Sequence, residues 1–257
     1  MSWKIDIMAE SITERASSLR QNPWLVFLLP FLVFMLVGSL EPTPNAPGGM
    51  LGLTIPYAAY PWVYLVKILA TLAAIGFVLP GYRQFPLRVS LLSVMVGVVG
   101  VVVWIGLCKL HLESRFLEPL GLGRFLDLGQ RSGYDPFARI SNPAGAWSFL
   151  AVRLLGLVVV VPVIEEFFLR GFFMRFAMEH DWWKVPFGTA TPLAIAIAPL
   201  YGILTHPAEL VAAAVWFSLV TWLMIRTRNL WDCVVAHAVT NLLLGAWVLA
   251  TGEWHFM

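Results

Sequence analysis

Two adjacent carboxylates stand inside an apolar stretch of this sequence, Val161–Arg175, which reads VPVIEEFFLRGFFMR. A carboxylate in the middle of a bilayer costs about 2.5–3.5 kcal/mol on insertion scales, so such a residue is usually functional. On a helix, Glu166 and Arg170 stand at i and i+4 and share one face, whereas Glu165 is turned about 100° away. We therefore expect Arg170 to hold Glu166 and Glu165 to be left for chemistry.

Pro162 precedes this pair and cannot donate a backbone hydrogen bond. We expect a kink in the helix there, with the carbonyl near Val158 open to water.

Three further polar residues occur in late apolar segments: His206, His237 and Asn241. His237 and Asn241 are at i and i+4, so they share a helix face. At about 1.5 Å per residue, Glu165 and His206 lie roughly 20 Å deep, and His237 and Asn241 roughly 10 and 17 Å deep. We expect the four side chains to meet in one water-filled cavity near the middle of the membrane.

The chemistry that these residues offer is hydrolysis. Glu165 and His206 can together orient and deprotonate a water molecule. His237 and Asn241 can donate hydrogen bonds to the oxyanion of a tetrahedral intermediate.

Other interpretations of the same residues stay open. Glu165, His206 and His237 could bind zinc, although a His-Glu-x-x-His helix is missing. Cys233 stands four residues before His237 and could be a nucleophile, although a thiol in apolar surroundings is inert. The polar residues could instead belong to a membrane scaffold or a transporter of a protein-sorting system, with Glu166–Arg170 as a structural pair, His206 as a helix cap and His237–Asn241 as interhelical contacts.

The composition is that of an integral membrane protein. Of 257 residues, 59% are hydrophobic and 12% are charged, and the mean hydropathy is +0.78, whereas soluble domains are about 25% charged. The net charge of +2 says little about partners. Cys108 and Cys233 both lie in apolar segments, so neither a disulfide scaffold nor a Cys-rich metal site is indicated.

The elements that must position the polar residues are apolar helices. We predict an all-α polytopic bundle of about seven transmembrane helices, over residues 24–40, 58–79, 87–110, 146–178, 191–206, 208–225 and 230–250. The whole chain, 1–257, would be a single membrane domain, with an N-terminal tail (1–23), three spans (24–110), an extramembrane segment (111–145) that could lay its apolar patches in the interface, and a four-helix catalytic core (146–250). The tail is either a surface amphipathic helix or unstructured.

Basic residues recur at every second boundary of these segments: Lys4, Arg15, Arg20, Arg83, Arg88, Arg175, Lys184, Arg226 and Arg228. The positive-inside rule then places the N-terminus in the cytoplasm and the C-terminus outside. Four arginines in residues 111–143 oppose this assignment mildly. We expect a multi-pass protein of the cell (inner) membrane.

The motifs resemble those of a known family. Glu-Glu-x-x-x-Arg at Glu165–Arg170, a His ending the next helix, and His-x-x-x-Asn after a basic turn are similar to the CAAX protease and bacteriocin-processing family of glutamate-dependent intramembrane endopeptidases. The resemblance covers about residues 146–250. One motif departs, because the family usually has an aromatic residue four positions before the middle His, where this chain has Gly202 preceded by Tyr201.

The resemblance implies which residues carry the reaction. The first Glu and the middle His would activate water, the last His and Asn would form the oxyanion hole, and neither a metal nor another cofactor would take part. The candidate catalytic residues are then Glu165, Glu166, His206, His237 and Asn241, supported by Arg170. The implied partners are a peptide or protein substrate near the membrane, with or without a lipid group, and the bilayer, but no nucleic acid. The N-terminal half resembles a subgroup associated with exosortase and PEP-CTERM sorting systems.

Overall fold

The computed structural model describes residues 19–44, 54–117, 119–121 and 133–257. The predictions for the N-terminal tail therefore fall almost entirely outside the described residues, as do residues 125–128, one of the apolar patches that we expect in the segment 111–145. All of the predicted spans lie within the described part of the chain.

Each predicted span is an apolar helix in the described ranges, where no strand occurs. Five helical runs are long and apolar enough to cross a bilayer, whereas the first and fifth spans are shorter, with 16 and 14 residues. In chain order the seven are α2 (Pro23–Gly38), α3 (Tyr60–Tyr82), α4 (Leu91–Lys109), the run α8–α10 (Pro143–Phe176), α11 (Pro192–Thr205), α12 (Leu210–Thr227) and α13 (Leu230–Thr251).

Side-chain caps fix where most of these helices begin. A cap side chain accepts a backbone N–H of the first turn, which would otherwise have no partner. Proline then often follows at the first helical position, where its missing N–H costs nothing. The caps are Asn22 on α2, Ser90 on α4, Asn142 on α8, Thr191 on α11 and Asn229 on α13.

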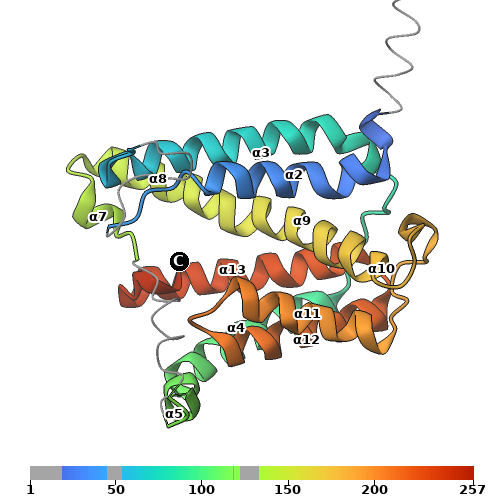
Figure 1. Ribbon diagram of the computed structural model, residues 1–257. Helices are drawn as coiled ribbons and strands as arrows, with labels where there is room; N and C mark the ends of the chain where they lie inside the picture. Colours follow the sequence, from blue (N-terminus) through green and yellow to red (C-terminus); the bar gives the residue numbers. More distant parts are fainter. Residues whose placement is uncertain (1–18, 45–53, 118, 122–132) are drawn as a thin grey trace, which may run out of the picture.

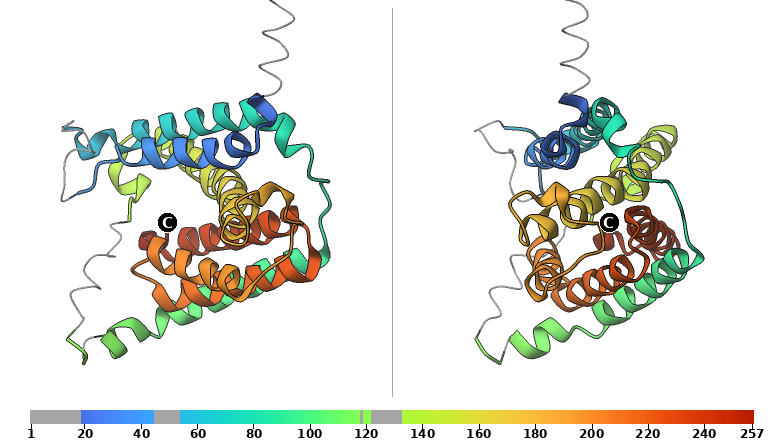
Figure 2. Two further views of the ribbon diagram at one scale, coloured as in Figure 1. Left: turned by 45° about the vertical axis from the view of Figure 1, so that its right-hand side comes forward. Right: turned by 90° about the vertical axis from the view of Figure 1, so that its right-hand side faces the viewer.

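The helices form two layers with a pair of helices between them. Helices α2 and α3 pack side by side in one layer, and α4, α11 and α12 form the other (Figure 1). Helix α13 packs on α4 and on α9 (Val161–Glu166), so α9 and α13 meet in the interior of the bundle (Figure 2). The residues on these two helices are therefore the ones that the fold can bring together away from lipid.

Large apolar side chains remain exposed along the helices. Val66, Leu69 and Val102 are 56%, 57% and 66% exposed. In water such continuous apolar faces would favour association or aggregation, whereas in a bilayer they face lipid chains. The predicted fold class, a polytopic helical membrane bundle, is confirmed, and the chain is a multi-pass membrane protein.

The segment between α4 and α8 contributes to the position of the site. It contains two short helices, α5 (Leu112–Leu117) and α7 (Pro136–Arg139). The buried carboxylate of Glu113 on α5 accepts the N–H of Val211 at 2.9 Å, in the first turn of α12. This contact ties the turn between α11 and α12 to the segment between α4 and α8.

Candidate active site

The helix that carries the two glutamates is distorted on both sides of them. A π-helical turn, Gly156–Val160, precedes α9, and a second one, Phe167–Phe173, follows it. In the first turn the N–H of Val161 bonds to the carbonyl of Gly156, five residues back. Pro162 would be the next donor in that pattern, to Leu157, but it has no N–H.

Asn241 supplies the donor that Pro162 lacks. Its side-chain nitrogen Nδ2 lies 2.8 Å from the carbonyl oxygen of Leu157. The sequence predicted the open carbonyl near Val158 with water as its partner. The carbonyl that lacks a backbone donor is that of the neighbouring Leu157, because the π-helical turn shifts the bonding pattern from i−4 to i−5, and a side chain of α13 is its partner.

Glu166 and Arg170 form the predicted ion pair. The guanidinium nitrogen Nη1 lies 2.5 Å from Glu166 Oε2, and both side chains are fully buried. Arg170 also donates through Nη2 to the carbonyl oxygen of Phe217, at 3.1 Å. The pair therefore links the second π-helical turn to α12.

His237 contacts both glutamates, an arrangement that the sequence did not predict. Its Nδ1 is 3.0 Å from Glu166 Oε1, and its Nε2 is 3.7 Å from Glu165 Oε2. The ring of Trp216 meets the imidazole at a centroid distance of 4.7 Å, close to edge-on. Glu166 thus has two partners, and His237 joins α13 to α9.

Glu165 is held by a residue of α11. Its Oε1 accepts the hydroxyl of Tyr201 at 2.9 Å, and its side chain is 16% exposed. Glu165 is thus not left free, as the sequence had suggested, but hydrogen-bonded on one oxygen. The sequence showed Tyr201 only as an aromatic residue displaced by one position from the expected motif.

His206 terminates α11 and is fixed by its own helix end. Its Nδ1 lies 2.9 Å from Thr205 Oγ1 and 3.2 Å from the carbonyl oxygen of Gly202. Trp104 of α4 packs edge-on against the ring at 5.3 Å between centroids. His206 is the C-cap of α11, the role that one interpretation of the sequence gave it, and it also lines the cavity described next.

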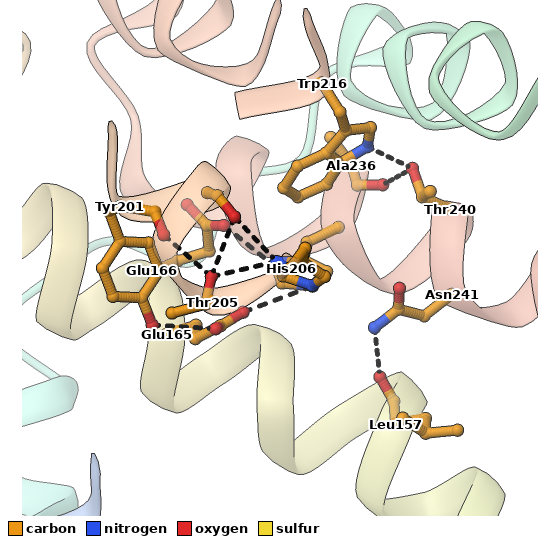
Figure 3. A network of polar contacts seen from close by, with 12 residues as sticks. Leu157, Glu165, Glu166, Tyr201, Thr205, His206, Trp216, Ala236, Thr240 and Asn241 are labelled. Carbon is orange, nitrogen blue, oxygen red and sulfur yellow. Dashed lines mark hydrogen bonds and ion pairs between the residues drawn. The ribbon is translucent and has the colours of Figure 1, made fainter. Parts of the chain in front are cut away.

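One cavity of about 590 Å³ contains all four of the predicted reacting side chains. Glu165, His206, His237 and Asn241 line it, together with Tyr201. Figure 3 shows Glu165, Tyr201 and Thr205 beside His206, with Asn241 reaching down to Leu157. Apolar walls come from α2, α4, α13 and the C-terminal turn, with Met35, Trp104, Leu244 and Phe256 among them. The structure therefore brings together residues from α9, α11 and α13.

Cys233 and metal binding are the other chemistries that the sequence left open. Cys233 is fully buried, its thiol lies 3.7 Å from the carbonyl oxygen of Asn229, and it is not among the residues that line the cavity. Within the described residues, no group of three or more His, Cys, Asp or Glu side chains is arranged to hold a metal ion.

Fold and site together define a class: a polytopic helical membrane protein whose helices bring carboxylate and imidazole side chains into one cavity. Residues 147–243 match one family model, whose description is "Type II CAAX prenyl endopeptidase Rce1-like". This match confirms the family resemblance over α8 to α13, which hold every candidate site residue. At the level of the family, it supports an intramembrane endopeptidase.

Neither the curated proteins nor the solved structures contain a match to the chain. The exosortase-associated subgroup stays a prediction.

Proposed function

We propose that this protein is an intramembrane endopeptidase that cleaves peptide bonds with a water molecule activated by Glu165 and His206. His237 and Asn241 stabilise the oxyanion, and Glu166 with Arg170 holds His237 in place. The observation that carries the proposal is the single cavity lined by Glu165, His206, His237 and Asn241. Four polar side chains from α9, α13 and the end of α11 line one cavity in a bundle whose outer faces are apolar.

The contacts of His206 favour a role as a base. The carbonyl oxygen of Gly202 can only accept a hydrogen bond. Nδ1 of His206 is therefore the protonated ring nitrogen and donates to it. Thr205 donates its hydroxyl hydrogen to the Tyr201 carbonyl, at 2.9 Å, so its oxygen can also accept from Nδ1. The proton on Nδ1 leaves the lone pair on Nε2, and this nitrogen can bind the hydrogen of a water.

The contacts of His237 favour a role as a donor to the oxyanion. Glu166, paired with Arg170, is an acceptor and takes the N–H of Nδ1. The nitrogen directed at Glu165 is then Nε2. An imidazolium in this position would balance the charges of two carboxylates and one guanidinium, and its Nε2–H would face the developing negative charge.

Asn241 is oriented by the carbonyl that Pro162 leaves without a donor. The Leu157 carbonyl oxygen is an acceptor, and only the nitrogen of the Asn241 amide can donate. The nitrogen, and not the oxygen, of this amide therefore faces the carbonyl. One N–H of that nitrogen is used in this bond, and the second is left to bind the oxyanion.

The reaction follows from these positions. The water oxygen attacks the carbonyl carbon of the peptide, and Glu165 takes the proton that the water loses. The oxyanion collapses, the C–N bond breaks, and the same proton passes to the leaving amine. The products are a carboxylic acid and an amine. The acid proton then passes to the amine to give a carboxylate and an ammonium group, and Glu165 is a carboxylate again.

The arginines indicate the side from which substrate enters. Arg83 and Arg88 follow α3, Arg226 lies in the last turn of α12, and Arg228 follows that helix, all at one end of the bundle. The cavity lining lies toward the other end, at Met35 late in α2 and at Pro207 between α11 and α12. If the arginines face the cytoplasm, the N-terminus is cytoplasmic and the cavity of this inner-membrane protein opens outward. A phosphatase that is active only outside the cytoplasm should then be active when it is fused after α13.

The test is cleavage by purified protein. The protein in detergent micelles is incubated with a panel of fluorescence-quenched decapeptides, and products are identified by mass spectrometry. We expect wild type to cleave, Glu165→Gln to be inactive because glutamine cannot accept the proton, and a chelator to have no effect. Glu179→Gln, in the turn after α10, is the matched control and should cleave normally.

Each alternative has its own outcome in this experiment. Loss of cleavage on chelation, with stoichiometric zinc in the active protein, would establish a metalloprotease that uses Glu165, His206 and His237. A Glu165→Gln protein that supports full biological function would establish a scaffold or transporter instead.

A further inference from the structure

The C-terminal part of α11 contacts both of the residues that we propose to activate water, Glu165 and His206. From its side chain, Tyr201 donates a hydrogen bond to Glu165 Oε1 at 2.9 Å. From its backbone, the carbonyl oxygen of Tyr201 accepts the hydroxyl of Thr205 at 2.9 Å. Thr205 Oγ1 in turn lies 2.9 Å from Nδ1 of His206. One residue is thus bonded to Glu165 directly and to His206 through a single hydroxyl (Figure 3).

The hydrogen bond from Tyr201 orients the carboxylate of Glu165. A carboxylate has two oxygens, and the hydroxyl of Tyr201 occupies one of them. The other, Oε2, is the oxygen that lies toward His237. Because the hydroxyl locks the carboxylate by one oxygen, the second oxygen is presented in one direction to the cavity.

Packing around Tyr201 holds its hydroxyl in this position. Its ring lies against those of Phe168 and Phe217, with centroid distances of 6.0 and 5.6 Å. The next residue is Gly202, where an added Cβ would stand 2.4 Å from the ring of Phe217. The absence of a side chain at Gly202 lets α11 approach α12 this closely, with Tyr201 turned toward Glu165.

We propose that Tyr201 and Thr205 are positioning residues that fix Glu165 and His206 relative to each other around the attacking water. This inference rests on the proposed function, since it assigns a role within the same reaction. Neither residue needs to touch the substrate to act in this way. Their loss should therefore lower the rate of the chemical step and leave substrate binding unchanged.

The hydroxyl of Tyr201 is tested by Tyr201→Phe, which keeps the packed ring. A hydrogen bond to a charged group corresponds to about 10- to 100-fold in rate, so we expect kcat for the fastest-cleaved quenched decapeptide to fall by about that factor with KM unchanged. Tyr201→Met, also without a hydroxyl but of different shape, should lose kcat likewise and serves if the phenylalanine variant does not fold. The matched control is Tyr64→Phe, whose hydroxyl donates to the carbonyl of Arg153 away from the cavity; its kcat should equal that of wild type.

The hydroxyl of Thr205 is tested by Thr205→Val and Thr205→Ser. A neutral hydrogen bond is expected to contribute about 2- to 10-fold in rate, so valine should lower kcat by that factor and serine should restore it. Thr227→Val is the matched control, because Thr227 makes the same bond to the carbonyl four residues earlier, at 3.0 Å, in the last turn of α12.

The split between kcat and KM, together with the recovery of kcat in Thr205→Ser, separates positioning from general damage. Wild-type kcat in Tyr201→Phe, a rise in KM alone, or an equal loss of kcat in Tyr64→Phe or Thr227→Val would overturn the inference while leaving the endopeptidase intact. Full cleavage by Glu165→Gln would instead overturn the proposed function, and the inference with it.

Discussion

Arg170→Ala tests whether the ion pair beneath the cavity supports the fold. The substitution removes a guanidinium that lies 2.5 Å from Glu166 and that also donates to the carbonyl of Phe217. Because both charged side chains are fully buried, alanine strands Glu166 with His237 as its remaining partner. Breaking a buried pair in this way costs about 3–5 kcal/mol. At about 2–4 °C per kcal/mol, the melting temperature should fall by roughly 6–20 °C.

The assay is thermal unfolding of the purified protein in detergent, followed by size-exclusion chromatography of the heated samples. Arg226→Ala is the matched control, since Arg226 is an exposed arginine on a neighbouring helix, and its melting temperature should not change. The double variant Glu166→Gln with Arg170→Met carries no stranded charge. It should recover most of the stability that Arg170→Ala loses.

Three results would contradict this reasoning. If Arg170→Ala melts within about 2 °C of wild type, the pair behaves like an exposed one, which contributes about 0–1 kcal/mol. If Arg170→Ala expresses and melts normally but does not cleave peptide, Arg170 acts on the substrate and not on the fold. If the double variant is no more stable than Arg170→Ala, a stranded charge is not the cause of the loss.

Three further outcomes follow from the site. Asn241→Ala should lower kcat by about 10²–10³-fold with little change in KM, measured on the same peptide, because an oxyanion donor acts mainly in the transition state. Cys233→Ser should cleave normally and resist alkylation in the folded protein, because the thiol is fully buried; loss of activity would restore the cysteine hypothesis. Gly156→Ala should destabilise by about 1–3 kcal/mol in thermal unfolding, since its Cβ would meet the Tyr64 hydroxyl at 2.2 Å, whereas Gly106→Ala, with no atom within 4 Å of the added Cβ, should be neutral.

The helices of this protein could be predicted from the sequence because their causes are local. Runs of apolar residues set the lengths of the spans, and cap residues such as Asn22 and Asn229 set their beginnings. The pairing of Glu166 with Arg170 was predictable for the same reason, since a separation of four residues on a helix fixes which side chains face each other. Buried charge also marked the candidate residues, because a bilayer makes such residues rare.

The partners of those residues depend on how the helices pack, and the sequence does not encode this in any local pattern. The bond from Tyr201 to Glu165 joins residues 36 apart, and the contact of His237 with Glu166 joins residues 71 apart. Both depend on the rotation of each helix about its axis. For α11, that rotation is governed by the close approach of Gly202 to Phe217, which only the assembled bundle contains.

The hydrogen bond between Asn241 and Leu157 depends both on the local sequence and on how the helices pack. The sequence alone determined that Pro162 would deprive a carbonyl of its donor, because proline has no N–H. The tertiary structure decided which carbonyl it would be, through the π-helical turn at Gly156–Val160, and which group would replace the donor. A missing hydrogen bond is a property of one residue, whereas its replacement requires a second helix at the correct distance and rotation.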